Sequence, residues 1–266
     1  MSSLGDVPLS FSVGGHFSYA GWRQWSCMVD AGRWLPLERW FRWDPSLDQL
    51  RVRRARVLHY LQAGPRVRPE VEEAVGEAVA AVRRLSQPRG GLARCALRTV
   101  EEGWVSLDGG DPFPLEDGYR EGARQAVVLL ATLGEGIQRE STLRFKRGEY
   151  LESLALDAVG SALVDELAAH LYRQAGALVA AEGLVPGYLL SPGCPQLLPE
   201  VQANLMREVP AQELGVYLND SGYLVPTKSL CALVPLLEGG RRRGSRAACG
   251  RCPQRERCFP PAEARS

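Results

Sequence analysis

The segment from Leu151 to Ala180 constrains the fold of this chain more than any other. Ala, Leu and Val recur along it on a wide stripe, and the polar positions between them include Asp157, Asp165, Glu166, Arg173 and Gln174. This spacing predicts one long helix with a broad buried side. We therefore expect the helix to hold the middle of the folded domain together.

Apolar runs of strand character lie on both sides of this helix. Residues Ala126–Leu133 form a continuous apolar run that ends at Gly134, which is typical of a strand buried on both faces. Ala93–Thr99 and Gly103–Leu107 predict two short strands joined at Glu101–Gly103. Leu214–Leu218 predicts a further strand, followed by a turn at Asn219–Gly222 and a second strand through Val225.

Shorter helices are expected elsewhere. A helical stretch runs from Leu50 to Leu61, and after a turn at Gly64-Pro65 a second helix begins near Arg68, with one apolar face made of Val71, Val75, Val79 and Val82. Tyr119–Gln125 and Glu200–Arg207 each predict a short helix. Gly183–Pro199 is rich in Gly and Pro and predicts a loop, and a short charged insert separates the strand ending at Leu133 from the long helix.

Composition divides the chain into three parts. Residues 1–48 form a Trp-rich extension containing Trp22, Trp25, Trp34, Trp40 and Trp43, residues 49–238 form the main domain, and residues 239–266 form a linker and a Cys-rich tail. The extension is either an irregular appendage that packs its aromatic side chains on the main domain, or a docking surface for a partner protein.

Charge and hydropathy limit the classes of partner. Lys and Arg number 32 against 31 Asp and Glu, so no global field favours nucleic acid or an anionic membrane. No apolar run reaches the roughly 18 residues that span a bilayer, and no secretory signal begins the chain. We expect a cytoplasmic location, and the odd number of cysteines, 7, also fits a reduced compartment.

The tail carries the clearest metal-binding pattern. Cys249 and Cys252 lie two residues apart, and Cys258 follows, so one cation or cluster can draw three thiolate ligands from a short segment. A [4Fe-4S] cluster and zinc are both compatible with this spacing, with Cys231 or Cys194 as an outside fourth ligand. The alternative is a reduced tail without metal.

Four stretches in fixed order carry a resemblance to a known family. They are AVVLLATLGEGI (126–137), LALDAVGSALVDELAAHLYRQA (154–175), LLSPGCPQLLPEVQANLM (189–206) and LGVYLNDSGYLVPTKSLCA (214–232). In the last, Gly215, Leu218, Ser221, Pro226 and Ser229 match the family pattern without a gap. Over about residues 50–237 the chain resembles the activation domain of vitamin-B12-dependent methionine synthase.

The resemblance implies an α+β fold with helices packed around a twisted antiparallel sheet. It also implies binding of S-adenosylmethionine, whose methyl group is presented to cob(II)alamin while an electron donor reduces the cobalt. The chain contains no Asp-x-His-x-x-Gly cobalamin motif, so the cobalamin is expected on a partner, a corrinoid protein or cobalamin-dependent methyltransferase acting in trans. The enzymes to which the resemblance relates this chain are the methyltransferases of the cobalamin-dependent methionine synthase family.

The same resemblance indicates candidate ligand-binding residues. They are Glu166 on the long helix, Ser191, Pro192 and Gly193 in the loop, Asp220 and Ser221 in the turn, and Lys228 after it. The family's loop arginine is missing: aligning Pro192-Gly193 with the motif puts Leu189 at the arginine position, and aligning Pro186-Gly187-Tyr188 puts Gly183 there.

Two of these candidates also have a simpler interpretation. Asp220 suits an ordinary turn, and Glu166 suits a solvated helix face. Lys228 is one of two lysines among many arginines, which indicates a position that needs a compact ammonium. For the whole protein, the alternatives to a reactivation factor are a non-catalytic binding module with a degenerate S-adenosylmethionine pocket and an iron-sulfur electron-transfer protein.

Overall fold

A computed structural model describes residues 40–64, 66–120, 122–194 and 196–238. Their main element is a seven-stranded sheet in which every pairing is antiparallel. The strand order is β4 (Phe113–Pro114), β3 (Trp104–Leu107), β2 (Arg89–Glu101), β5 (Gln125–Thr132), β9 (Ser229–Glu238) and β6 (Leu184–Pro186), with β1 (Trp40–Trp43) pairing along the other end of β2. A separate hairpin joins β7 (Tyr217–Leu218) to β8 (Leu224–Val225).

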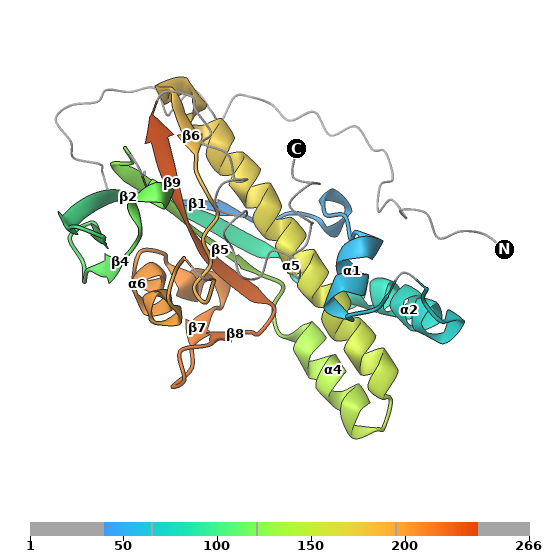
Figure 1. The fold of residues 1–266 in the computed structure, drawn as a ribbon. Coiled ribbons are helices and arrows are strands. Elements are labelled where there is room, and N and C mark those ends of the chain that lie inside the picture. Colours follow the sequence, from blue (N-terminus) through green and yellow to red (C-terminus); the bar gives the residue numbers. More distant parts are fainter. Residues whose placement is uncertain (1–39, 65, 121, 195, 239–266) are drawn as a thin grey trace.

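Helices cover both faces of the sheet, so the predicted α+β architecture is confirmed (Figure 1). One face carries α1 (Arg54–Tyr60), α2 (Pro69–Leu85), α4 (Gly136–Lys146) and α5 (Tyr150–Val179). The other face carries α6 (Gln202–Arg207) and its neighbouring loops, and α3 (Asp117–Arg120) precedes β5. Single 3-10 turns occur at Leu47–Gln49, Ala180–Glu182, Pro199–Val201 and Ala211–Leu214.

Strand β5 divides the interior into two clusters because its side chains alternate between the two faces. One set joins the helix-side cluster and comprises Val127, Leu129 and Ala131. The other set joins the cluster beneath α6 and comprises Ala126, Val128 and Leu130. Both sets are buried, which confirms the prediction of a strand buried on both faces.

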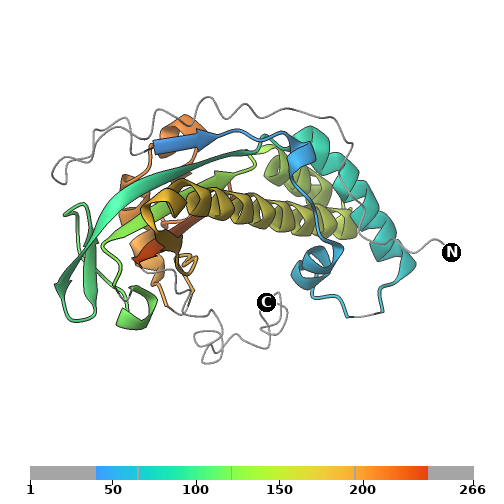
Figure 2. The same ribbon diagram turned by 90° about the horizontal axis from the view of Figure 1, so that it is seen from above.

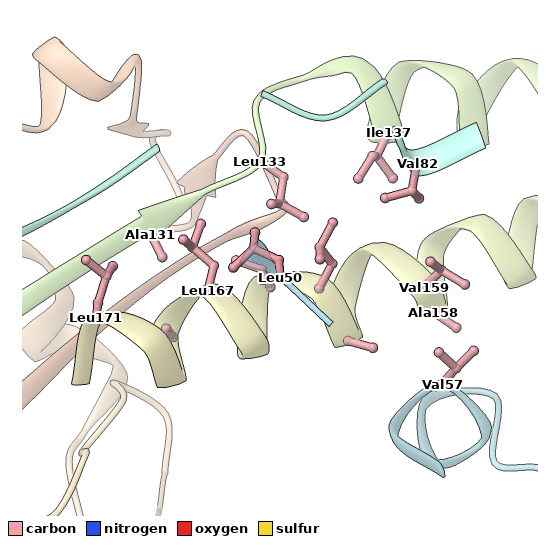
Figure 3. Packing of buried hydrophobic residues seen from close by; sticks show 14 of the residues in the cluster. Leu50, Val57, Val82, Ala131, Leu133, Ile137, Ala158, Val159, Leu167 and Leu171 are labelled. Carbon is pink, nitrogen blue, oxygen red and sulfur yellow. The ribbon is translucent and has the colours of Figure 1, made fainter. Parts of the chain in front are cut away.

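Helix α5 is the organising element of the first cluster, as its pattern predicts. Viewed from above, it lies along the sheet and continues past it to pack with α2 and α4 (Figure 2). Val57 from α1, Val82 from α2 and Ile137 from α4 surround it near Val159 (Figure 3). Each fully buried aliphatic side chain of this kind contributes about 1.5–3 kcal/mol to folding.

Two of the N-terminal tryptophans pack on the domain. Trp40 and Trp43 are the first and last residues of β1, and Trp40 lies over Gly91, where an added Cβ would come 2.1 Å from the indole ring. Trp43 contacts His170 with ring centroids 5.0 Å apart. For these two residues the packing interpretation holds. Trp22, Trp25 and Trp34 lie outside the described residues.

The structure corrects several expected elements. The charged insert is helix α4, which packs on α5 through reciprocal hydrogen bonds between Ser141 and Ser153. The strand expected over Leu214–Leu218 is shortened to Tyr217–Leu218, because Gly215 adopts φ +70° and ends a 3-10 turn. The helix expected over Tyr119–Gln125 lies at Asp117–Arg120 instead.

Strands that the sequence pattern did not indicate complete the sheet. β9 is one of them, and it contains Pro235 inside an apolar run, a residue that argues against a central strand. Another is β6, inside the expected Gly183–Pro199 loop. In the described part of the chain, no helix is both long and apolar enough to cross a membrane.

Candidate functional site

Lys228 is buried against helix α5. Its Nζ lies 2.7 Å from Asp157 Oδ1 and donates a hydrogen bond of 2.9 Å to Ser161 Oγ. Asp157 and Ser161 are four residues apart on α5, so they share one face of the helix. The lysine side chain is 8% exposed and the aspartate 55%, so the ion pair lies at the edge of the core.

Gly160 makes the space for this lysine. A Cβ at position 160 would come 3.3 Å from Lys228 Cε and 3.0 Å from Ile137 Cγ2. A narrow ammonium on a flexible stem fits this space better than a planar guanidinium. The packing therefore accounts for a lysine in a chain that otherwise uses arginine almost throughout.

The backbone around Lys228 ties the sheet together at the same end. The Leu133 N–H donates to the Lys228 carbonyl over 2.9 Å, and Ser229 Oγ donates to Thr132 Oγ1 over 2.8 Å. Thr227 N–H donates to the Gln138 side chain of α4. Lys228 thus joins the end of β5, the start of β9 and helix α5, which is a structural role.

The turn before Lys228 carries Asp220 and Ser221 on its exposed side. Asn219 Oδ1 accepts the N–H groups of Ser221 at 3.1 Å and Tyr223 at 2.9 Å, so the side chain of Asn219 closes the turn. This confirms the predicted turn at Asn219–Gly222. The bonds that close it do not involve the Asp220 carboxylate, which is exposed and accessible to a ligand.

The loop that contains Ser191, Pro192 and Gly193 is anchored on β9. Leu190 and Leu233 exchange backbone hydrogen bonds of 2.9 and 2.8 Å. Gly193 adopts φ +90° and donates its N–H to the Leu197 carbonyl, while Ser191 and Pro192 are half-buried. Gly193 itself is exposed, and an added Cβ there would meet nothing within 4 Å.

The second possible alignment of the loop motif falls on a packed segment. Gly187 donates its N–H to the Pro235 carbonyl over 2.7 Å and accepts a bond of 2.8 Å from the Tyr172 hydroxyl. A Cβ at Gly187 would come 3.0 Å from the Pro235 carbonyl oxygen. This segment therefore uses its polar groups to pack on β9, and the loop at Pro192-Gly193 is the more accessible of the two.

Glu166 lies away from Lys228. It pairs with Arg53 at 3.8 Å and Arg173 at 3.5 Å, on the side of α5 that faces α1. Asp157 and Glu166 are nine positions apart, and at about 100° per residue this is two and a half turns, which places the two carboxylates on opposite sides of the helix. The structure therefore brings Glu166 together with arginines and not with the group around Lys228.

Of the cysteines proposed as metal ligands, Cys249, Cys252 and Cys258 lie outside the described residues. Cys231, one candidate for a fourth ligand, is buried in β9, and burial raises the pKa of its thiol to about 12. Since the thiolate is the metal-binding form, and no group of three metal-binding side chains in the described part of the chain includes Cys231, this environment disfavours Cys231 as a ligand. Cys194 is half-buried in the loop and is the better placed of the two.

The sequence pattern did not indicate that Asp157 and Ser161 are the partners of Lys228. Asp157 stood out only as one of several polar positions on the helix, and a pairing across 67 residues of sequence leaves no local pattern. The spacing of Asp157, Gly160 and Ser161 is the one available indication of a shared helix face.

No protein-family model matches this sequence, and no curated protein matches it. Among solved structures, the chain is similar to the crystal structure of the MetH reactivation domain bound to AdoHcy, with 12% sequence identity and a TM-score of 0.55. The likeness covers 74% of this chain and 78% of that one. The chain therefore has the fold of a MetH reactivation domain.

Proposed function

We propose that this protein is an S-adenosylmethionine-binding reactivation factor. It supports reductive methylation of a corrinoid methyltransferase or methionine synthase that is a separate chain. The observation that carries the proposal is the fold likeness to a reactivation domain whose structure contains AdoHcy. The fold likeness, at 12% identity, and the resemblance of the sequence motifs point to the same kind of domain.

We assign the ligand to two segments, the loop at Ser191–Gly193 and the exposed turn at Asn219–Gly222. Asp220 offers a carboxylate that can accept hydrogen bonds from the ligand ammonium or ribose, a charge-assisted contact. Ser191, Pro192 and Gly193 offer a polar loop anchored on β9. Ser221 follows Asp220 directly in the chain. Tyr223, three residues after Asp220, is 71% exposed, and its ring is available to stack on adenine. Lys228 fixes the strand that follows.

In this role the protein mainly positions S-adenosylmethionine and does little acid-base chemistry. S-adenosylmethionine supplies an electrophilic methyl group, and reduced cobalamin on the partner supplies the nucleophile. The residues of this chain need to bind the amino acid and nucleoside ends and to orient the sulfonium outward. The partner and an electron donor complete the system.

A calorimetric titration with S-adenosylmethionine tests the proposal and its site together. Asp220→Asn should weaken binding about tenfold, which corresponds to loss of about 1.4 kcal/mol. Asp48→Asn is the matched control, because it removes another exposed aspartate that pairs with Arg83 at 3.5 Å. Unchanged binding by Asp220→Asn would remove the turn from the site.

We also propose that Cys249, Cys252 and Cys258 hold a metal centre, either a [4Fe-4S] cluster that delivers electrons or a structural zinc. Their close spacing is the observation that favours it. Anaerobic purification followed by metal and sulfide analysis distinguishes the two centres. Iron with sulfide identifies the cluster, zinc without sulfide identifies the structural site, and a metal-free tail contradicts the proposal.

A further inference from the structure

Three side chains that can bind a metal meet on the sheet face opposite the long helix. They are Cys95 from β2, Asp108 directly after β3, and Glu208 directly after α6. One ligand atom from each lies within 4.8 Å of the others. Cys95 is 3% exposed, Glu208 is half-buried and Asp108 is exposed, so the group runs from the core to the surface.

The fold brings these three side chains together from segments that are far apart in sequence. In the β2–β3 hairpin Leu97 pairs with Leu107, which puts Asp108 opposite Ala96. Asp108 adopts φ +47°, donates its N–H to the Ala96 carbonyl over 2.9 Å and accepts the Ala96 N–H at Oδ1 over 2.8 Å. Glu208 is the residue that caps the C-terminal end of α6.

The separation of two of the ligands fits tetrahedral coordination. Cys95 Sγ and Glu208 Oε2 are 3.7 Å apart. In a tetrahedral zinc site with a Zn–S distance of about 2.3 Å and a Zn–O distance of about 2.1 Å, sulfur and oxygen lie about 3.6 Å apart. Without metal, the Cys95 thiol donates to the Glu208 carboxylate across the same distance.

A small cavity borders the group. Its volume is about 30 Å³, enough for a water molecule, and it is lined by Leu107, Gly110, Asp111, Phe113, Asn204, Arg207 and Glu208. Arg207, the cation in its wall, pairs with Asp111. Glu208 belongs both to the cavity wall and to the cluster, so the cavity offers space for a water molecule beside one of the three side chains.

We propose that Cys95, Asp108 and Glu208 form a binding site for a thiophilic divalent metal, with zinc as the best match. One sulfur and two carboxylate ligands suit zinc or cobalt better than magnesium or calcium, which prefer oxygen alone. On binding, the metal–sulfur bond replaces the S–H bond of Cys95 and the proton passes to solvent. The site is independent of the function proposed above.

Cobalt substitution tests this site in the full chain. The parent carries Cys249→Ser, Cys252→Ser and Cys258→Ser, so that the tail contributes no thiolate. One equivalent of Co²⁺ should produce near-ultraviolet thiolate-to-cobalt charge-transfer absorption, which Zn²⁺ should abolish by displacement. Glu208→Gln and Asp108→Asn should each weaken binding by at least about 100-fold, because even outer-shell changes cost 10–100-fold.

The control is Glu200→Gln, an exposed glutamate at the start of the same helical segment, which should bind like the parent. Circular dichroism melts without metal establish that each variant is folded, and Asp108→Asn, at an exposed position, provides a variant should Glu208→Gln fail to fold. Absence of the charge-transfer band in the parent, or parent-like binding in Asp108→Asn, would overturn the proposal.

Discussion

Lys228 Nζ lies 2.7 Å from Asp157 Oδ1, and this pair connects two of the segments on which the family resemblance rests. Asp157 belongs to the stretch 154–175 and Lys228 to the stretch 214–232. A third stretch, 189–206, is joined to the same strand by the backbone bonds between Leu190 and Leu233. These three resembling segments are therefore neighbours in the fold.

Lys228→Met should lower the free energy of unfolding by about 1–2 kcal/mol, since it keeps the buried stem but removes two charge-assisted hydrogen bonds. Asp157→Asn should cost less because that side chain is 55% exposed. Urea denaturation of both single variants and the double variant gives their coupling energy. Additive effects would show that the pair contributes nothing to stability.

Gly136→Ala and Gly76→Ala should change stability in opposite directions. A Cβ at Gly136 would lie 2.2 Å from the Leu85 carbonyl oxygen, so backbone must move, and we expect a loss of more than about 1 kcal/mol. Gly76 is an exposed helical position with nothing within 4 Å, and alanine there should stabilise by about 0.5–1 kcal/mol. Thermal melts compare them, and a stabilised Gly136→Ala variant would contradict the packing of α4 on α2.

Gly91→Ala should displace Trp40, because an added Cβ would lie 2.1 Å from its ring. We expect destabilisation of about 1–3 kcal/mol. In a Trp40→Ala background the same glycine substitution should cost much less, since the ring is gone. Denaturant titrations of the four chains measure this, and an equal cost in both backgrounds would show that β1 does not pack as described.

His170 should make the protein less stable as the pH falls. Burial, with help from Arg173, lowers the pKa of His170 below its ordinary value of 6.5, while Glu166 opposes the shift. The unfolded chain therefore takes up a proton near 6.5 that the folded chain resists, and stability falls from there down to the folded-state pKa.

His170→Phe keeps a ring against Trp43 and removes this titration. Its advantage over the parent, measured by urea denaturation, should grow from neutral pH to about 5. His59→Gln controls for the removal of a histidine. A constant difference across this pH range would exclude the role given to His170.

The sequence pattern predicted those helices and strands whose burial is uniform along their whole length. Helix α5 was predicted from an apolar stripe that recurs along its whole length, and strand β5 from a continuous apolar run. Strand β9 was missed because Pro235 interrupts its apolar run, yet the partner strands β5 and β6 hold it in the sheet. Helix α4 was missed because its only fully buried side chain is Ile137.

The sequence predicts those parts of the candidate site that local hydrogen bonds determine. It does not predict the parts that depend on tertiary contacts. The turn around Asp220 follows from the side chain of Asn219, which acts within four residues. The partners of Lys228 and the meeting of Cys95 with Glu208, 113 residues apart, depend on the packing of whole elements. No short sequence window contains that information.

The proposed function requires the described domain to bind S-adenosylmethionine. Equilibrium dialysis of the full chain against labelled S-adenosylmethionine tests it most directly, with AdoHcy as competitor and ATP as the unrelated adenine nucleotide. We expect saturable binding of one ligand per chain, which AdoHcy displaces and ATP does not. No retained label at millimolar ligand, or equal displacement by ATP, would contradict it.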